Sequence, residues 1–361
     1  MAPATGLFDG AGLMERERGA ALLMALLLAV LVAVLAAGMM RDEQRRMRLL
    51  ENQRTRDQMA QLGEGALDWA RLMLRDDWRL TGAVDHGGEV WALPINDIPV
   101  DSVLGGEAAS LRLSGRIVDA QSRFNLMSLL KVQNPQGDRG WVAASDIDAA
   151  ALTVFQRLLA DLGLDPAQAA PIARQLLASR FDGPPMQGNH GTAMAGEMVL
   201  SQQQLAAEPV PWGRAMDLAR WFPDADATTL SHLGEMLVLL PRPTLVNANT
   251  ASAAVLGAIL GVDPGQLSGV MQERQQQFFV DTADLQRRLS AALPTLTGAP
   301  VAMLGVNSDY FYVLEEWRAP TAVQRRQVLV ARHQGGGQMT QVIGEQNGWS
   351  LGALDTPGGG T

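Results

Sequence analysis

The sequence predicts an α+β protein: a long N-terminal helix, then an antiparallel sheet whose strands are separated in the chain by a large inserted helical domain. Three observations predict this. An uncharged apolar run near the N-terminus continues into residues that favour helix. Alternating strand-like segments occur both soon after that run and near the C-terminus. Between them lies a long region rich in alanine and leucine, which favours helices.

The first element is the apolar helix. Residues 19–40 carry no charge, and a run of about 20 apolar residues is long enough to cross a bilayer. Residues 41–77 contain no proline and are rich in helix formers. An apolar stripe at helical spacing continues along this second part: Leu62, Ala66, Trp69 and Met73. We therefore expect one helix from residue 20 to about 76, locally weakened at Gly63 and Gly65.

The remaining elements follow from alternation and from breaks in it. Strands are expected near residues 89–93, 110–118, 309–314, 327–331 and 338–343. Residues 147–293 read as helices broken by prolines, with a loop dense in glycine and proline at 181–196. The domain boundaries that follow are 41–125 and 294–361 for the two parts of the sheet domain and 126–293 for the helical insertion.

Composition excludes several classes of function. With 361 residues, 47% of them hydrophobic, the chain is not mainly disordered. The absence of cysteine excludes disulfides, thiol nucleophiles and cysteine-based metal sites. A net charge of -9 argues against nucleic acid as a partner. No catalytic motif is present, and the paired carboxylates Asp224/Asp226 and Glu315/Glu316 are expected to be solvated charges, so the sequence predicts no catalytic residue and no enzyme.

The junction before the apolar run resembles the leader peptide of type IV pilins and type II secretion pseudopilins. It reads Glu17, Arg18 and Gly19, followed by the apolar segment AALLM. The resemblance implies that prepilin peptidase removes residues 1–19 by cleaving between Gly19 and Ala20, and that the new amino group of Ala20 is methylated. Residues 20–40 would then be the transmembrane part, with the folded part outside the cytoplasm. The positive-inside rule alone favours the opposite orientation, because more arginines follow the run than precede it.

The fifth position after this junction departs from the usual pilin pattern. Most pilin-like subunits have glutamate there, whereas this chain has Met24. A carboxylate in lipid is costly unless it is paired, and in a pilus its partner is the amino terminus of a neighbouring subunit. A subunit at the tip of the fibre lacks that neighbour, so Met24 fits a tip subunit.

Three further segments resemble the minor pseudopilin K family of type II secretion systems. They are SGRIVDAQSRFNL at 114–126, AGE at 195–197 and LVNANTASAAVL at 245–256. The resemblance implies a pilin-like sheet domain with an inserted helical domain of SAM-like, helix-hairpin-helix-like type. It also implies a single-pass protein of the inner membrane with its folded part in the periplasm, which nucleates the pseudopilus tip and supports protein export.

The partners that the resemblance implies are minor pseudopilins I and J, other pseudopilins, prepilin peptidase and the inner-membrane secretion platform. The secretin and exported proteins are further candidates for contact. A minor pilin of a type IV pilus or DNA-uptake system is the alternative, although such pilins usually keep the glutamate and lack the insertion.

The segment 245–256 also has a second interpretation, as the phosphate-gripping part of a membrane-anchored DNA-binding protein. A simpler interpretation makes Asn249 or Thr250 the N-cap of a helix at 251–260, which ends at Gly261. Residues 243–272 contain no basic side chain, so little in this segment could hold a phosphate.

Calcium is the one cofactor that the resemblance raises. The family is associated with calcium near the loop that precedes its Gly-Ala-Glu segment, and the matching residues here are Asp182 and Glu197. Pro184 and Met198 stand where further acidic residues are common. The two carboxylates are therefore either calcium ligands or ordinary polar groups of a loop.

Overall fold

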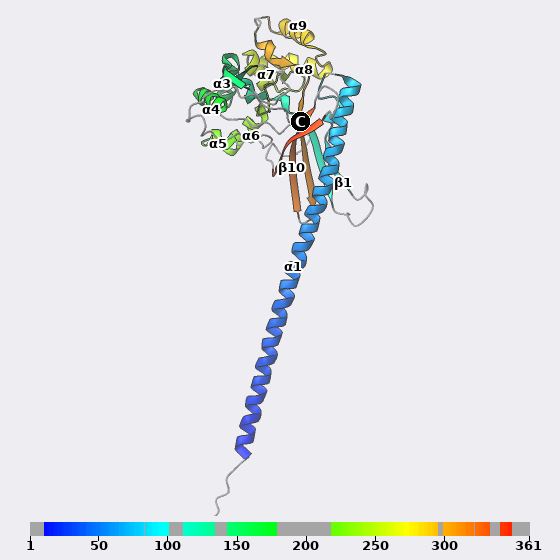
Figure 1. Cartoon of the computed structure of the whole chain (residues 1–361), viewed down its shortest axis with the longest axis vertical. Helices are drawn as coiled ribbons and strands as arrows, with labels where there is room; N and C mark the ends of the chain where they lie inside the picture. Colours follow the sequence, from blue (N-terminus) through cyan, green and yellow to red (C-terminus); the bar gives the residue numbers. More distant parts are fainter. Residues whose placement is uncertain are drawn as a thin grey trace, which may run out of the picture. The chain divides into compact units, whose positions relative to one another are not determined.

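The computed structural model describes residues 11–82, 84–100, 111–133, 143–178, 218–294, 299–320, 322–332 and 340–348. The chain divides into two compact units, residues 1–60 and residues 61–361. Helix α1 (Ala11–Thr81) is 71 residues long and runs through the end of the first unit into the second (Figure 1). It begins nine residues earlier and ends five residues later than the sequence predicted.

In the first unit, the apolar side chains of α1 face outward all around the helix. Leu26, Leu27 and Leu28, which point in three different directions around the helix, are 64%, 69% and 59% exposed. This helix is long and apolar enough to cross a membrane. An apolar helix without a polar face is stable only in lipid or against other apolar helices.

The second unit contains one large antiparallel sheet, in which the strand order is β1-β2-β9-β10-β11. The bounds are β1 (Ile95–Pro99), β2 (Arg112–Asp119), β9 (Tyr310–Ala319), β10 (Ala322–Arg332) and β11 (Thr340–Asn347). Strands β2 and β9 pair directly, with Asp119 opposite Phe311, although residues 120–309 lie between them in the chain. The intervening chain is the predicted insertion.

The C-terminal part of α1 packs on one face of this sheet. Leu67, Ala70 and Leu74 are buried against alternate residues of the strands, which share a face because strand side chains have a period of two. The strand residues of this core are Ile117, Phe311, Val313, Val328 and Val330. This arrangement fixes residues 61–81 of the helix to the sheet.

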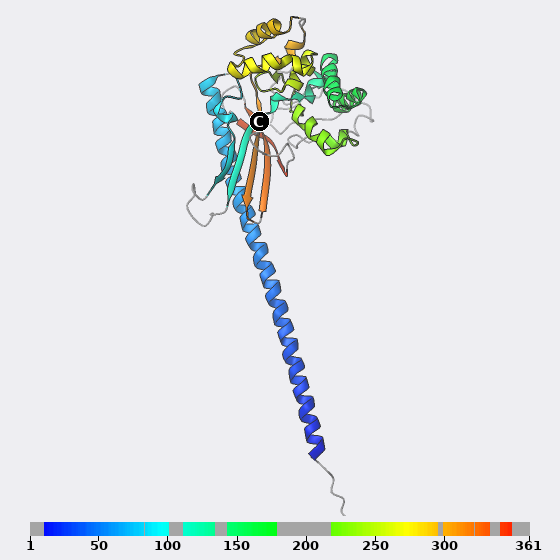
Figure 2. The same cartoon turned by 180° about the vertical axis from the view of Figure 1, so that it is seen from behind.

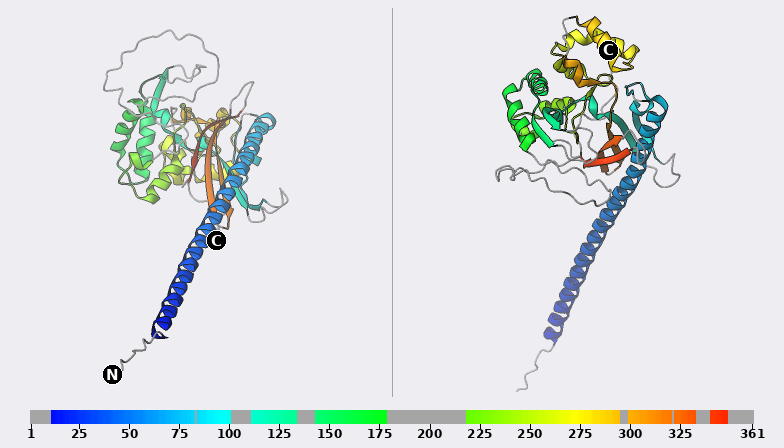
Figure 3. Two further views of the ribbon diagram at one scale, coloured as in Figure 1. Left: turned by 60° about the horizontal axis from the view of Figure 1, so that its bottom comes forward. Right: turned by 45° about the horizontal axis from the view of Figure 1, so that its top comes forward.

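The insertion is helical and has its own hydrophobic core, built from residues between Phe124 and Val306. Its helices are α3 (Ala149–Asp161), α4 (Ala169–Ala178), α5 (Leu218–Trp221), α6 (Ala227–Met236), α7 (Ala253–Leu260), α8 (Ser268–Gln276) and α9 (Thr282–Ala292). They gather at the end of the sheet where β2 finishes and β9 begins (Figures 1 and 2). The helical region and the sheet remain distinct in both tilted views of Figure 3.

Short elements connect the two regions. Three two-stranded pairs involve β3 (Phe124–Asn125) with β6 (Leu237–Val238), β4 (Leu130–Gln133) with β5 (Ala143–Ile147), and β7 (Val246–Asn247) with β8 (Leu304–Gly305). The 3-10 turns are η1 (Val90–Ala92), η2 (Ala120–Ser122), η3 (Leu126–Leu129), η4 (Pro166–Gln168), η6 (Pro264–Leu267) and η7 (Ala299–Met303). Pairing of β7 with β8 brings together the two ends of the segment that contains α7, α8 and α9.

The predicted α+β class, with a long helix, an antiparallel sheet and additional helices, is confirmed, and the last three expected strands correspond to β9, β10 and β11. The strand expected at 89–93 is wrong, because this segment forms the turn η1. The Glu89 carboxylate accepts hydrogen bonds from His86 N and from the Trp91 indole, which closes the chain on itself. The predicted loop 181–196 lies outside the described residues, since 179–217 are not described, and it stays a prediction. The predicted domain boundaries also stay predictions.

Candidate functional site

Two of the quoted motifs meet in the interior of the second unit. Asp119 ends β2, and Asn247 ends β7. The Asn247 amide donates to Asp119 Oδ2 at 2.9 Å and to Ser308 Oγ at 3.1 Å, and the Thr250 hydroxyl donates to the same Asp119 oxygen at 2.5 Å. Asp119 and Asn247 are 3% and 0% exposed. The two bonds to Asp119 join segments more than 100 residues apart in the chain.

Arg332, at the end of β10, extends this arrangement to α1. Its Nη2 donates to both carboxylate oxygens of Asp85, at 2.5 and 2.6 Å, and its Nη1 donates to Asp77 Oδ2 at 3.1 Å. The guanidinium is 1% exposed and lies over the Phe311 ring, 4.7 Å from its centroid. We call the group Asp77, Asp85, Asp119, Asn247, Ser308 and Arg332 the polar centre.

The electrostatics of the polar centre are dominated by burial. Burial raises the pKa of Asp85 to about 7, and the Arg332 guanidinium and the backbone N–H of Ser308 oppose this rise. Burial also raises the pKa of Asp119, against the hydrogen bonds from Thr250 and Ser308. Each carboxylate therefore depends on its donors, and loss of one donor leaves a buried polar group unpaired.

The other asparagines of these motifs hold loops. The Asn249 amide donates to Phe279 O at 2.9 Å, and its oxygen accepts from Phe279 N at 2.8 Å, which fixes the segment between α8 and α9. The Asn125 amide donates to Arg242 O at 2.7 Å, and its oxygen accepts from Leu240 N at 3.1 Å. The motif residues thus bind the chain to itself.

The expectation that Asn249 or Thr250 caps the following helix is wrong. Helix α7 begins at Ala253, and its N-cap is Ser252, whose Oγ accepts from Val255 N at 3.3 Å. The predicted stop at Gly261 is confirmed, with φ of 72° in the left-handed region that glycine favours. Since the asparagine side chains are buried and already paired, they do not offer groups to a phosphate.

An apolar cavity of about 370 Å³ lies between α1 and the β1 side of the sheet. Its lining includes Trp69 and Met73 of α1, Trp91 of η1, and Ile98 and Leu113 of the strands. The charged residues of this lining are Arg116 and Glu315. A surface of this kind is suited to packing against apolar groups rather than to acid–base chemistry.

The predicted cleavage residues and Met24 lie in the described part of the chain, whereas the predicted calcium ligands do not. Gly19 and Ala20 fall in the helical backbone of α1, and Met24 is 66% exposed. The calcium candidates Asp182 and Glu197 lie outside the described residues. The cleavage, methylation and calcium assignments therefore stay predictions.

The two pairs of carboxylates that the sequence analysis named differ in their exposure to solvent. Asp224 and Asp226 are exposed as expected, and Asp226 caps α6. The expectation of solvated charges is wrong for Glu315 and Glu316, which are 2% and 1% exposed. Glu316 pairs with Arg318, two residues further along β9, and with Arg325 Nε at 2.7 Å, which lies opposite it on β10.

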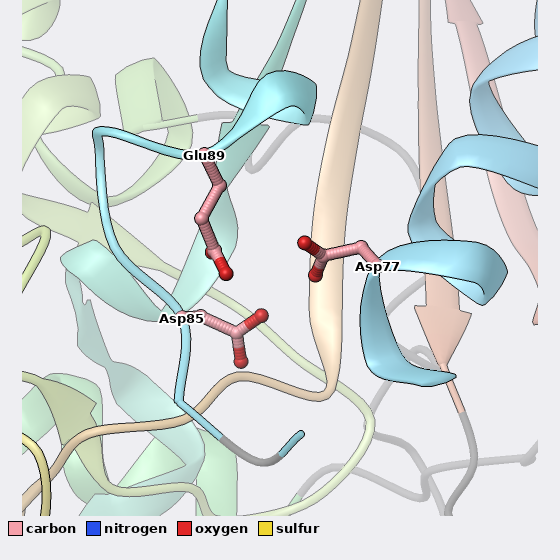
Figure 4. A group of neighbouring side chains, drawn as sticks. All are labelled: Asp77, Asp85 and Glu89. Carbon is pink, nitrogen blue, oxygen red and sulfur yellow. The ribbon is translucent and has the colours of Figure 1, made fainter. Parts of the chain in front are cut away.

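Asp77, Asp85 and Glu89 form a group that the sequence did not predict. One oxygen from each lies within 4.8 Å of the others (Figure 4). The spacing between Asp85 and Glu89 in a turn-rich segment is a weak local signal, and the approach of Asp77 depends on the tertiary fold.

An apolar N-terminal helix that continues into a helix packed on an antiparallel sheet defines the class of pilin-like subunits. Here a helical region is inserted between β2 and β9. A family model for type II secretion system protein K matches residues 246–307, the stretch that runs from β7 through Asn307. The chain is 30% identical over 335 residues to type II secretion system protein K of Pseudomonas aeruginosa, with 89% of each chain covered.

The chain belongs to the type II secretion system protein K family and is a minor pseudopilin. Its fold is similar to a chain in the crystal structure of the GspK–GspI–GspJ complex from the type 2 secretion system of enterotoxigenic Escherichia coli. The TM-score is 0.58 at 19% identity, covering 83% of this chain and 99% of that one.

Proposed function

We propose that this minor pseudopilin forms the tip of the type II secretion pseudopilus together with minor pseudopilins I and J. The observation that carries the proposal is the shared fold with a protein solved as a GspK–GspI–GspJ complex, over nearly the whole of that chain. The tip complex would nucleate the pseudopilus and support protein export across the outer membrane.

The protein is anchored in the inner membrane by residues 20–40, and its second unit lies in the periplasm. The outward-facing leucines of α1 support membrane insertion, since they have no apolar partner within the chain's described residues. The four arginines after the run, Arg41, Arg45, Arg46 and Arg48, favour the opposite orientation. Recognition of the leader junction by prepilin peptidase on the cytoplasmic face is what sets the proposed orientation.

Met24 supports the tip position. A glutamate at this point in lipid would require the amino group of a subunit above it, and the cost of an unpaired charge there is several kcal/mol. Methionine removes that requirement, so the subunit above can be absent. The inserted helical region adds bulk that is hard to place beneath another subunit of a thin fibre.

The protein acts by assembly rather than by catalysis. Its buried polar groups bind one another, and its apolar surfaces on α1 are suited to lateral packing of helices by shape. Prepilin peptidase, other pseudopilins and the inner-membrane platform are the further partners, with the secretin and exported proteins as contacts beyond the tip.

N-terminal sequencing and intact mass of the membrane-extracted protein test the processing route. Cells with and without prepilin peptidase are compared. A start at Ala20 with one added methyl group, only in cells with the peptidase, is the expected result. Retention of residues 1–19 in both cells would mean that the segment is an ordinary anchor, and the proposed orientation would fail with it.

Copurification tests the tip complex separately. The full chain carrying an affinity tag is extracted in detergent from cells that make minor pseudopilins I and J. Both partners should be recovered in amounts comparable to the tagged chain. Recovery of neither partner, from cells where the chain is correctly processed, would contradict the tip assignment.

A further inference from the structure

Four arginines directly follow the apolar run of α1. They are Arg41, Arg45, Arg46 and Arg48, and all four are helical and exposed (Figure 1). Among the described residues, the ion pairs that α1 makes involve only its residues 64–79. The four guanidinium groups therefore have no acidic partner in the described part of the chain.

Three of these arginines lie on one face of the helix. At about 3.6 residues per turn, Arg41, Arg45 and Arg48 lie within about 60° of one another around the helix axis. The two carboxylates of this stretch, Asp42 and Glu43, lie outside that arc. We call Arg41, Arg45 and Arg48 the arginine face. It places three positive charges on one side of the helix.

The arginine face lies at the depth of the lipid headgroups when residues 20–40 cross the bilayer. At about 1.5 Å per residue, that segment matches a hydrocarbon core of about 30 Å, and the headgroup layer adds about 5–8 Å on each side. Arg41, Arg45 and Arg48 lie about 2, 8 and 12 Å beyond residue 40. Helical side chains tilt toward the N-terminus of their helix, so these guanidinium groups reach back toward the membrane.

We propose that the arginine face binds the phosphate headgroups of anionic phospholipids in the leaflet from which α1 emerges. The inference rests on the proposed anchoring by residues 20–40. Arginine binds phosphate through paired, charge-assisted hydrogen bonds. Basic residues beside a membrane span are also attracted by the negative potential of an anionic lipid surface.

A neighbouring subunit fits the other side of the helix better. Leu50 lies opposite the arginine face, and Met47 lies about 60° from Leu50 around the axis. These two side chains are 62% and 56% exposed. Apolar side chains of this kind suit lateral packing between helices. A helix that packs there leaves the arginine face directed toward lipid.

Lipid binding also accounts for the conflict between the arginines and the proposed orientation. The positive-inside rule disfavours arginines beside the span on the periplasmic side. Anionic headgroups around the arginine face compensate this charge after insertion. The arginines are then compatible with a second unit in the periplasm.

Native mass spectrometry of the full-length protein in detergent, mixed with equal amounts of phosphatidylglycerol and phosphatidylcholine, tests the proposal. The variant Arg45→Gln/Arg48→Gln removes two charges from the arginine face. The matched control, Arg54→Gln/Arg56→Gln, removes two exposed arginines of α1 that lie about 21 and 24 Å beyond residue 40, outside the headgroup layer.

We expect wild type and the control to retain phosphatidylglycerol over phosphatidylcholine by about fivefold or more, since each arginine near an anionic surface contributes about that factor. The ratio for Arg45→Gln/Arg48→Gln should be lower than the wild-type ratio by about fivefold or more. Equal ratios in all three proteins would overturn the proposal. An equal loss in the control would overturn it as well, because net charge and not the arginine face would then set the preference.

Flotation with vesicles of pure phosphatidylcholine separates this proposal from the anchoring on which it rests. All three proteins should float, because the apolar run is unchanged. Wild-type protein that does not float would refute the anchoring, and the lipid site with it. Flotation of all three without a preference for phosphatidylglycerol would refute the arginine face alone.

Two further measurements identify the source of the phosphate group and the class of partner. An excess of inorganic phosphate, matched in ionic strength by sodium chloride, should leave the lipid ratio unchanged. Loss of phosphatidylglycerol in phosphate alone would mean that the arginines bind phosphate ions and not lipid. Copurification of minor pseudopilins I and J should be the same for both variants. Loss of both partners from Arg45→Gln/Arg48→Gln, with an unchanged lipid ratio, would assign the face to a protein and overturn the proposal.

Discussion

Glu315 is a buried acid on β9 whose surroundings make the stability of the fold depend on pH. It is 2% exposed, and its Oε2 accepts from the Trp317 indole at 3.2 Å. Burial raises its pKa from 4.5 to about 7, although Arg326 opposes the rise. Arg326 is itself engaged by Glu64 at 2.6 Å and by Glu345 at 2.9 Å, so it neutralises Glu315 only in part.

We predict that Glu315→Gln flattens the pH dependence of stability. Because the folded state holds this proton more tightly than the unfolded state, the stabilising contribution is complete below about pH 4.5 and is lost as pH rises through about 7. The wild-type free energy of unfolding should thus fall by about 3 kcal/mol more than that of Glu315→Gln across this window. Urea unfolding at pH 4.5 and pH 8 measures the difference.

The exposed Asp224 provides the control for this prediction. Asp224→Asn should follow the wild-type pH profile, since it removes a carboxylate from water and not from the sheet. A Glu315→Gln profile with the same slope as wild type would show that Glu315 stays ionised in the fold.

Gly63 and Gly65 form a matched pair within α1. A Cβ at Gly63 would lie 3.0 Å from Glu315 Oε2 and 3.3 Å from Arg326 Nη1, whereas a Cβ at Gly65 meets nothing within 4 Å. Replacing glycine by alanine in a helix gains up to about 1 kcal/mol. We predict that Gly65→Ala gains about that amount and that Gly63→Ala is less stable than Gly65→Ala by about 1–2 kcal/mol. Thermal unfolding of the two variants side by side checks the order, and equal stabilisation of both would contradict it.

Between elements, the bond from Asn247 of β7 to Asp119 of β2 connects the insertion to the sheet. We predict that Asn247→Asp lowers the free energy of unfolding by about 3–5 kcal/mol, because it replaces a donor to Asp119 with a second buried carboxylate. Thr250→Ser keeps the hydroxyl that donates to Asp119 and should cost less than about 1 kcal/mol. Urea unfolding of both variants is the measurement, and a stable Asn247→Asp would mean that the polar centre does not join the two regions.

Elements with local signals could be predicted from the sequence. The apolar run and the absence of proline are local, so α1 was expected, although its ends were not exact. Alternation predicted β9 and β10 for the same reason. The strand prediction at 89–93 was wrong because the Glu89 carboxylate accepts hydrogen bonds from His86 N and from the Trp91 indole. The alternation of apolar residues along the sequence does not predict these bonds.

The polar centre could not be predicted in the same way. Thr250 donates to Asp119 across 131 residues, and Arg332 reaches Asp85 across 247. The periodicity of apolar residues in the sequence does not predict pairs that are this far apart in the chain. The resemblance singled out Asp119, Asn247 and Asn249 as parts of motifs, but their role as internal bonds required the fold. Arg332 had no sequence signal, and the group of Asp77, Asp85 and Glu89 had only the weak local spacing of Asp85 and Glu89.

For the whole molecule, the absence of glutamate at Met24 bears on its place in the fibre. We predict that Met24→Glu is tolerated or mildly harmful to secretion. The new carboxylate has no amino terminus above it at the tip, but a position near the start of the helix lies close to the membrane interface, where a charge costs less than at the centre. The amount of a secreted protein in the medium measures the effect. A complete block would argue that Met24 is in tight contact with a neighbouring helix.

A charge in the middle of the apolar segment should instead stop assembly. We predict that Ala33→Asp abolishes secretion and copurification with minor pseudopilins I and J. An aspartate at the centre of a span costs about 2.5–3.5 kcal/mol on insertion scales, and it also replaces a small residue where helices pack by close approach. Ala33→Leu, which remains apolar, should insert normally and separates the effect of charge from that of size. Since residue 33 lies in the first unit and the polar centre lies in the second, the folded part of Ala33→Asp should melt as in wild type. Normal secretion by Ala33→Asp would refute a membrane-embedded helix as the element that assembles the tip.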